Sequence, residues 1–257
     1  MVRGLEKFQE YFKGFIGNYV VIGGTACDIA ISEAGLRPRA TKDIDIILIV
    51  EALSTEFIYK FWEFVEAGNY VIKEKGEKDR RYYRFNKPSL DEYPYQVEIF
   101  SKNPDILDLK EGSHLTPIPV SEGITSLSAI LMDGEYYNFT IDHSNIVNGV
   151  RIANTEALIC LKAKAYLDLS KRKSEGEEIS DKETRKHKHD VLRLTVLLSE
   201  DDTFTLPDSL KQDLRDFVDL IKEDLPDGAI FKEMGSGNID VQELFDHLIK
   251  NFYLALP

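Results

Sequence analysis

The sequence predicts an α/β (α+β) fold, in which a small mixed β-sheet with helices is followed by a helical C-terminal domain. Two short apolar runs, 18–22 and 42–51, alternate with amphipathic helical segments in the first half of the chain. After about residue 150 the apolar residues recur with helical spacing. The 257 residues suffice for two domains with buried cores. We therefore expect one domain over 1–150 and a helical domain over 151–257.

The composition predicts a globular protein. Apolar residues make up 43% of the chain and charged residues 30%, which is an ordinary balance for a folded domain. The first residues, MVRGLEKFQEYF, form an amphipathic pattern without the apolar run of a signal peptide. No apolar stretch approaches the length of a membrane span. These features predict a cytoplasmic location and no membrane partner.

The net charge of −13 argues against a broad surface for non-specific nucleic-acid binding. It leaves open a local basic groove. The two cysteines, Cys27 and Cys160, lie among apolar neighbours without disulfide or zinc spacing, so we expect core thiols.

The elements of the first half follow from periodicity and from capping residues. Ser54 is placed to begin a helix that Gly68 ends. The predicted helices are 4–16, 24–34 and 55–67, and the predicted strands are 18–22, 42–51, 69–74, 80–86 and 94–101.

The second half is expected to be mostly helical. The pairs Asp133-Gly134 and Asn148-Gly149 predict turns, and Asn154 is placed to cap a long helix. The all-polar stretch 172–186 is interpreted as a loop or a frayed helix start. The predicted helices are 155–171, 186–199, 206–224 and 239–253.

The stretch from Gly23 to Asp45 carries the candidate chemistry. Strand side chains alternate, so Asp43 and Asp45 point to the same face, and a divalent cation such as Mg²⁺ would remove their mutual repulsion. Gly23 and Gly24 precede a helix whose free N–H groups suit an anion, and Thr25 adds a hydroxyl there.

These residues resemble the signature of the nucleotidyltransferases of the polymerase-β superfamily, in which a glycine turn, a helix and an Asp-x-Asp strand follow one another. The longer spacing, with Gly-Gly-Thr-Ala and Arg-x-Thr-x-Asp-Ile-Asp over residues 39–45, is similar to the AbiEii-type toxin branch. The alternative is that a common glycine turn precedes a solvated strand edge.

The resemblance implies a third metal-site carboxylate on a later strand, and Glu98 in the apolar strand YQVEIF matches it. The alternative is an exposed acid on a half-buried strand. The nearby Arg80, Arg81 and Arg84, which flank two tyrosines, predict either a base- or phosphate-binding strand or a charged sheet edge.

The resemblance also implies a helical lysine that contacts the triphosphate, and Lys162 in the segment Lys-Ala-Lys-Ala takes that place. The alternative is that Lys162 and Lys164 extend to solvent. Asp190 loosely matches a later acidic motif, although Arg193 stands where its second aspartate would be. The expected nucleotide-binding set is Gly23, Gly24, Thr25, Lys42, Lys162 and Asp190, and the expected catalytic set is Asp43, Asp45, Glu98 and Lys162.

The activity implied by the resemblance is transfer of a nucleoside monophosphate from an NTP to an acceptor, with Mg²⁺ or Mn²⁺ as cofactor. RNA or protein is the expected acceptor, and an antitoxin protein is the expected partner. The alternatives are a small-molecule nucleotidyltransferase of the antibiotic-modifying kind and a catalytically silent member that binds nucleotide or a partner.

Overall fold

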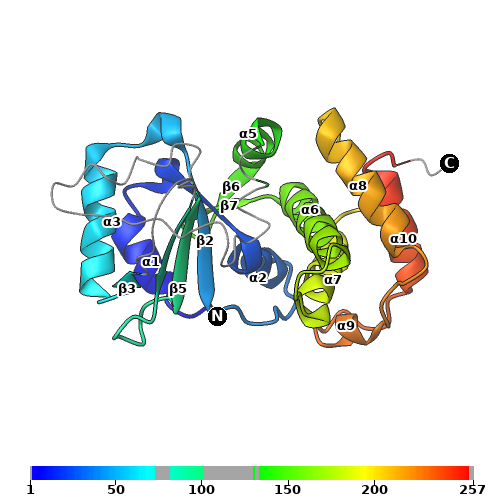
Figure 1. The fold of residues 1–257 in the computed structure, drawn as a ribbon, viewed down its shortest axis with the longest axis horizontal. Helices are drawn as coiled ribbons and strands as arrows, with labels where there is room; N and C mark the ends of the chain where they lie inside the picture. Colours follow the sequence, from blue (N-terminus) through cyan, green and yellow to red (C-terminus); the bar gives the residue numbers. More distant parts are fainter. Residues whose placement is uncertain (1, 73–81, 101–129, 131–132, 255–257) are drawn as a thin grey trace. The chain divides into compact units, whose positions relative to one another are not determined.

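The fold is described from a computed structural model that covers all residues except 1, 73–81, 101–129, 131–132 and 255–257 (Figure 1). The helices are α1 (Leu5–Phe12), α2 (Gly23–Glu33), α3 (Thr55–Ala67), α5 (Gly134–Asp142), α6 (Thr155–Ser174), α7 (Asp181–Thr195), α8 (Asp208–Ile221), α9 (Ala229–Lys232) and α10 (Val241–Asn251). Two short 3₁₀ helices span Ile16–Asn18 and Val50–Ala52. None of these described helices is both long enough and apolar enough to cross a membrane.

The strands form one mixed sheet. They are β1 (Tyr19–Ile22), β2 (Asp43–Leu48), β3 (Val71–Ile72), β4 (Tyr82–Asn86), β5 (Gln96–Phe100), β6 (Ser144–Val147) and β7 (Val150–Ala153). Their order across the sheet is β3-β4-β5-β2-β1-β7-β6. The predicted α/β class, with a mixed sheet followed by helices, is confirmed. Of the predicted basic-aromatic strand, Arg80 and Arg81 lie outside the described residues.

The chain divides into two compact units that are not continuous in sequence. The first unit comprises Met1–Asp28, Ala40–Met132 and Ser144–Ala153, and it contains the whole sheet. The second unit comprises Ile29–Arg39, Asp133–His143 and Asn154–Pro257, and it is helical. The segments 29–39 and 133–143 therefore cluster with the C-terminal helices.

An aromatic core holds the first unit together. In Figure 1, α1 and α3 lie on the same side of the sheet. Phe12 on α1 stacks with Phe61 on α3 at 6.1 Å between ring centroids, and Phe8 meets Tyr19 of β1 edge-on at 5.2 Å. Rings of this size dominate a core by the area that they bury. This packing makes β1 and β2 rigid supports for the residues at their ends.

Local sequence signals predicted some of the turns and helix ends correctly and others wrongly. Ser54 accepts a hydrogen bond from the Phe57 N–H, and α3 has the predicted limits 55–67. Asn148 and Gly149 both have positive φ and join β6 to β7, which confirms a hairpin turn there. The turn predicted at Asp133-Gly134 is wrong, because the Asp133 side chain instead caps α5 by accepting from the Glu135 N–H.

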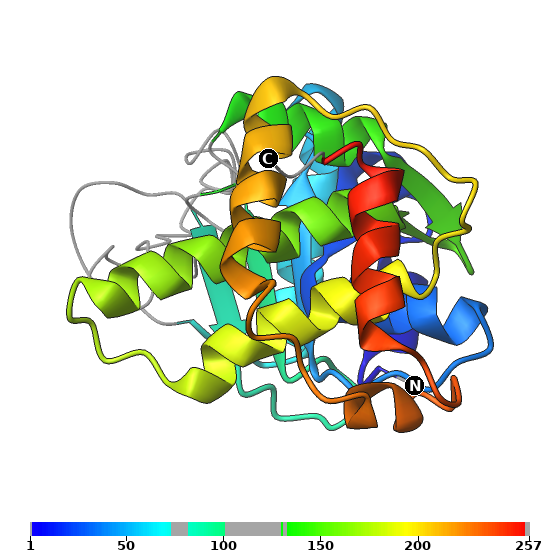
Figure 2. The same cartoon turned by 90° about the vertical axis from the view of Figure 1, so that its right-hand side faces the viewer.

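The second unit is a set of packed helices, visible face-on in Figure 2. Contacts join α6 to α7 and α8, and α10 to α7. A small cluster around Leu192 of α7 and Phe231 of α9 also buries Ile31 and Met234, and the backbone N–H of Arg37 donates to the Met234 carbonyl at 2.9 Å. The segment that follows α2 is therefore attached to the second unit.

Candidate functional site

The glycine turn at the start of α2 lies against the carboxylate of Asp45. Gly23 has a φ of +67°, a conformation that costs little only for glycine. A Cβ placed on Gly23 would lie 2.0 Å from Asp45 Oδ2 and 2.9 Å from its Cγ. No side chain fits in that space without moving the carboxylate. The turn and the Asp-x-Asp strand thus meet at one point.

Thr25 fixes the neighbouring aspartate through its backbone. The Thr25 side chain is fully buried, and its hydroxyl donates a hydrogen bond of 2.5 Å to the Asp43 carbonyl oxygen. The role that this geometry supports is to hold α2 to the first residue of β2. Phosphate binding by Thr25 stays a prediction.

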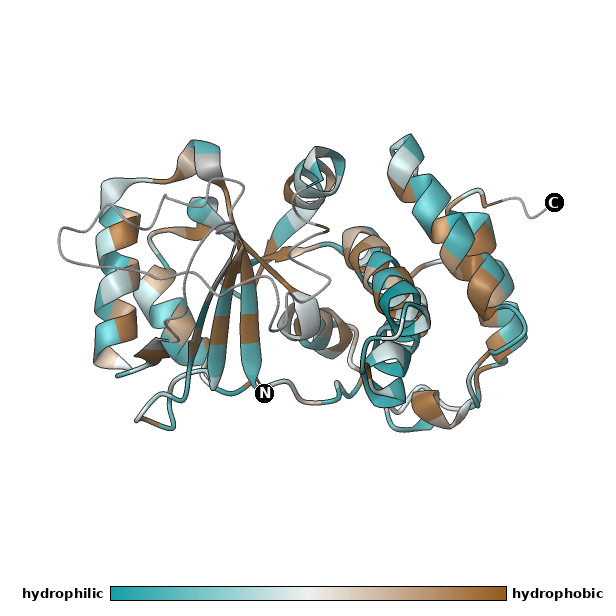
Figure 3. Cartoon of the chain, in the orientation of Figure 1, coloured by the Kyte–Doolittle hydropathy of each residue, from teal (hydrophilic) through white to brown (hydrophobic). Residues whose placement is uncertain are grey.

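Glu98 lies beside Asp45 on the neighbouring strand. β2 and β5 run parallel, and their register aligns Asp43 with Gln96 and Asp45 with Glu98. Aligned residues of adjacent strands point to the same face, at a strand spacing of about 4.8 Å. Ile44, which aligns with Val97, is buried on the opposite face. The alternation of polar and apolar residues along β2 is visible as coloured bands in Figure 3.

The three carboxylates differ in their surroundings. Asp43 and Asp45 are half-buried, whereas Glu98 is only 3% exposed. Glu98 Oε1 accepts hydrogen bonds from Arg84 Nε at 2.5 Å and from Gln96 Nε2 at 3.0 Å. The alternative of an exposed acid is therefore excluded for Glu98. Arg84 supplies the counter-charge that this buried carboxylate requires.

The acidic residues suit a divalent metal to different degrees. Hard oxygen ligands on a rigid strand suit Mg²⁺ or Mn²⁺, and Asp43 and Asp45 supply them. Within the part of the chain that the structure describes, no three His, Cys, Asp or Glu side chains already form a metal-binding cluster. Glu98 would join the two aspartates only if its hydrogen bonds to Arg84 and Gln96 rearranged. Asp43 and Asp45 therefore suit the metal ion as they stand, whereas Glu98 suits it only after that rearrangement.

The start of β2 has a second anchor. The backbone N–H of Thr41 donates to Asp28 Oδ2 at 2.7 Å, and Asp28 is 2% exposed. The carbonyl of Lys42 accepts from the Tyr95 N–H at 3.0 Å, while the Lys42 side chain is exposed. The residues before Asp43 are therefore fixed by backbone hydrogen bonds, and Lys42 is accessible to an anion.

Lys162 and Asp190, both expected to bind nucleotide, are brought together in the second unit. Lys162 Nζ lies 2.9 Å from Asp190 Oδ2, and these residues are 5% and 3% exposed. The alternative in which Lys162 extends to solvent is wrong, because its ammonium is paired inside the unit. Lys164 is different, since its side chain is 35% exposed and pairs with Asp213 at 2.6 Å.

Two arginines complete the surroundings of Asp190. Arg39 Nη2 lies 3.4 Å from Asp190 Oδ2, and Arg193 Nη1 lies 3.9 Å from Oδ1. Burial acts to raise the pKa of the Asp190 carboxyl, but the charges of Lys162 and Arg39 outweigh it and hold that pKa below its ordinary value. Asp190 is therefore an ionised hub that positions three cations.

His187 lies near the same hub. Burial, and then the charge of Lys162, lowers the pKa of His187 to about 3. Its Nδ1 is buried and has no hydrogen-bond partner among the described residues. The imidazole is therefore neutral at pH 7. From the sequence, His187 lacks metal-ligand spacing and is predicted to be solvated, and that prediction is wrong because its Nδ1 is buried.

Sequence reasoning missed Asp28, and it named Arg84 and Arg39 without predicting their partners. Asp28 stands out as an acid inside the apolar run ACDIAI, a signal that was available. The partners of Arg84 and Arg39 could not be predicted from the sequence, because Glu98 and Asp190 meet these arginines only through the tertiary fold. The seven site residues of the sheet region, Gly23, Gly24, Thr25, Lys42, Asp43, Asp45 and Glu98, belong to the first unit, and Lys162 and Asp190 belong to the second.

Comparison with known proteins gives a limited result. No protein-family model and no curated protein sequence matches the chain. Among solved structures, the chain is similar to the crystal structure of an antigenic nucleotidyltransferase-like protein from Paracoccidioides brasiliensis. The TM-score is 0.48 and the identity is 11%, and the match covers 96% of this chain and 94% of that one.

Proposed function

We propose that the chain transfers a nucleoside monophosphate from an NTP to an acceptor hydroxyl, with Asp43, Asp45 and Glu98 as the acidic centre. The observation that carries the proposal is the register of β2 and β5, which aligns Asp45 with Glu98 on one face. The close approach of Gly23 to the Asp45 carboxylate adds independent support. An acidic face beside a glycine turn suits a metal–triphosphate complex.

The proposed reaction is a substitution at the α-phosphorus. The acceptor oxygen forms a bond to that phosphorus, and the bond to the oxygen bridging the α- and β-phosphates breaks. Pyrophosphate leaves with the electron pair, and the acceptor's proton passes to solvent. A bound Mg²⁺ or Mn²⁺ would neutralise triphosphate charge and lower the pKa of the acceptor hydroxyl.

The chain's own residues would position the reactants. The turn at Gly23 and Gly24 presents N–H groups at the start of α2 to phosphate oxygens. Thr25 holds Asp43 through its carbonyl, and the exposed Lys42 offers a cation to the triphosphate. Lys162 and Asp190 are retained as nucleotide-binding candidates on the strength of the sequence resemblance, as a buried pair rather than as free groups.

The acceptor that we propose is RNA or protein, with an antitoxin protein as partner. The support is the resemblance of residues 39–45 to the AbiEii-type branch. A small-molecule alcohol is the alternative acceptor, and an assay can separate the two.

A second candidate function is nucleotide or partner binding without transfer. The ion pair between Arg84 and Glu98 favours it, because it neutralises the third carboxylate. Under this alternative, the chain would bind metal–NTP through Asp43 and Asp45 but would show no transfer to any acceptor.

The test is a transfer screen with NTPs radiolabelled at the α-phosphate, offered with total RNA, lysate proteins and aminoglycoside-type alcohols. Transfer should require Mg²⁺ or Mn²⁺ and should be lost in Glu98→Gln. The matched control is Glu156→Gln, which also changes a buried glutamate, of the second unit. If the chain binds NTP but transfers label to none of the acceptors in a metal-dependent way, the second candidate function is favoured.

A further inference from the structure

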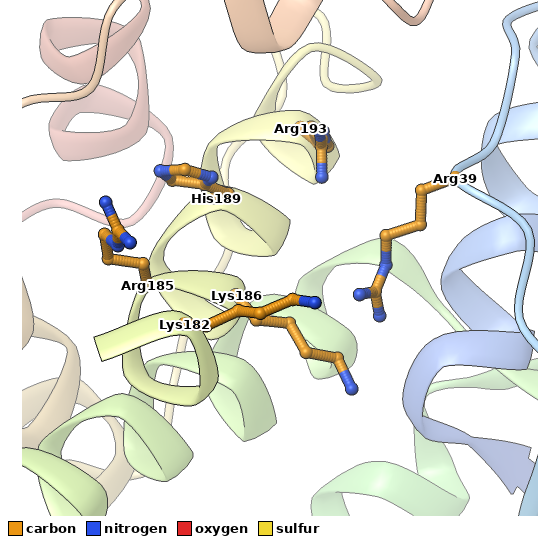
Figure 4. A pocket seen from close by; sticks show the side chains of 6 residues that line it. All are labelled: Arg39, Lys182, Arg185, Lys186, His189 and Arg193. Atoms are coloured by element: carbon orange, nitrogen blue, oxygen red, sulfur yellow. The ribbon is translucent and has the colours of Figure 1, made fainter. Parts of the chain in front are cut away.

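A pocket in the second unit is lined by basic side chains. Its volume is about 240 Å³, and its lining residues are Arg39, Lys182, Arg185, Lys186, His189 and Arg193. Five of them come from α7, and Arg39 comes from the segment that follows α2. Figure 4 shows Lys182 and Lys186 extending from α7 toward the side on which Arg39 lies. All six residues belong to the second unit.

The spacing along α7 explains how the pocket forms. Positions 182, 186, 189 and 193 follow steps of four and three residues, and position 185 lies three residues from 182 and four from 189, so all five share one helical face. The opposite positions are apolar or buried, with Val191 and Leu194 fully enclosed. In Figure 3, α7 is correspondingly hydrophilic over much of its length. The helix therefore buries one side and presents a basic side.

The pocket concentrates positive charge in a chain whose net charge is −13. Its two lysines and three arginines are cationic at pH 7. Burial, and then the charge of Arg193, lowers the pKa of His189, so that histidine adds no charge at neutral pH. Such a cluster repels itself, and an anion in the pocket would relieve the repulsion.

Internal acids compensate the cluster only in part. Asp190 lies near Arg39 and Arg193, but its single negative charge also pairs with Lys162 and so compensates the arginines only in part. Glu233 reaches Arg193 Nη2 at 3.5 Å from a side chain that is 79% exposed. Among the described residues, Lys182 and Arg185 form no ion pair. The pocket therefore keeps an excess of cations.

The lining determines which anion fits. It contains no phenyl, phenol, indole or aliphatic side chain, and its only planar groups are three guanidiniums and the His189 imidazole. The volume of about 240 Å³ is below the roughly 300–1,000 Å³ of sites that enclose a whole small molecule. Guanidinium groups match phosphate oxygens in geometry and keep their charge.

We propose that this pocket binds a chain of consecutive phosphate groups, as in a polyphosphate or the phosphate tail of a nucleotide. A nucleic-acid strand is the less favoured occupant, because its phosphates are separated by sugars, whereas five cations surround a pocket of only about 240 Å³ here. The inference does not rest on the proposed nucleotidyl transfer, because it uses no residue of the acidic centre.

The direct test is calorimetric titration of the full chain with tripolyphosphate, without divalent metal and at constant ionic strength. We expect tripolyphosphate to bind at one site, with an affinity that sulfate does not reach. Arg185→Gln with Lys186→Gln should weaken binding at least tenfold. The matched control is Lys211→Gln with Arg215→Gln on α8 of the same unit, and it should stay within twofold. Asp43→Asn with Asp45→Asn should also bind tripolyphosphate as the wild type does.

A second measurement avoids substitutions. Tripolyphosphate should protect Lys182 and Lys186 of the wild-type chain from acetylation, measured by mass spectrometry, while Lys211 stays reactive. Equal weakening in the pocket and control variants, or no protection, would overturn the proposal. Pocket-dependent binding of single-stranded oligouridylate without binding of tripolyphosphate would overturn it too, since the occupant would then be a nucleic-acid strand.

Discussion

The α-carbon of Gly23 approaches Asp45 so closely that a Cβ there would lie 2.0 Å from the carboxylate Oδ2. The two residues are 22 positions apart, and β1 and β2 bring them together, with Ile22 opposite Asp45 in the register. Because the contact requires a glycine, the turn and the carboxylate depend on each other.

Gly23→Ala should impair metal–NTP binding more than it impairs folding. The new Cβ meets the Asp45 carboxylate, and the φ of +67° adds about 1–2 kcal/mol of backbone strain. The control is Gly149→Ala, because Gly149 has a φ of +79° with nothing within 4 Å of the added Cβ. We expect Gly149→Ala to lower the melting temperature through strain alone, Gly23→Ala to lower it at least as much, and only Gly23→Ala to lose Mg²⁺–NTP affinity. Equal affinities in both variants would make Gly23 a purely structural residue.

Arg84→Gln should destabilise the first unit by about 3 kcal/mol, since it leaves the buried Glu98 without its counter-charge. Adding Glu98→Gln should recover much of that loss. Urea unfolding of the wild type, both single variants and the double variant gives the coupling energy. Additive losses, with no coupling, would show that Arg84 does not stabilise the Glu98 carboxylate.

Lys162→Met should destabilise the second unit by about 3–5 kcal/mol, because it leaves Asp190 buried with weaker compensation. Lys164→Met is the control two positions away, where the ion pair is partly exposed and worth about 1 kcal/mol or less. Chemical denaturation measures both. Losses of the same size would mean that the burial of the Lys162 pair has no energetic consequence.

Stability should fall as the pH drops from 7 to 5. The pKa of His187 is about 3 in the folded chain, below its value of about 6.5 when unfolded, so the unfolded state binds more protons in this window. The slope is at most about 1.4 kcal/mol per pH unit for one group. His187→Gln should flatten the dependence, as measured by urea unfolding at both pH values. An unchanged slope in His187→Gln would assign the effect to other groups.

Features that depend on neighbouring residues could be predicted from the sequence. Helix α3 begins as predicted because Ser54 caps its first turn, and it ends before Gly68 as predicted, although the left-handed residue there is Asn69, with a φ of +48°. The stretch 172–186 was misjudged, although Ser180 and Glu183 form a capping box that begins α7. The all-polar composition of the stretch favoured a loop, although the capping box is a local signal for a helix.

Features that depend on strand pairing or helix packing could not be predicted. The sequence indicated that Glu98 shares a strand face with other polar residues, but only the register of β5 against β2 and β4 places it beside both Asp45 and Arg84. The pairing of Lys162 with Asp190 likewise depends on how α6 packs on α7. The basic face of α7 was not predicted, because Lys182 and Arg185 were assigned to the polar stretch 172–186, and the position of Arg39 beside it depends on the tertiary fold.

The most direct test of the acidic centre is the Mg²⁺–NTP affinity of Asp43→Asn with Asp45→Asn, measured by calorimetry. The control is Asp201→Asn with Asp216→Asn, which removes the same charge from exposed sites of the second unit. We predict that the first pair abolishes Mg²⁺–NTP binding with the fold intact, and that the control retains it. Unchanged affinity in Asp43→Asn with Asp45→Asn would contradict the account, because the metal–nucleotide site would then lie elsewhere.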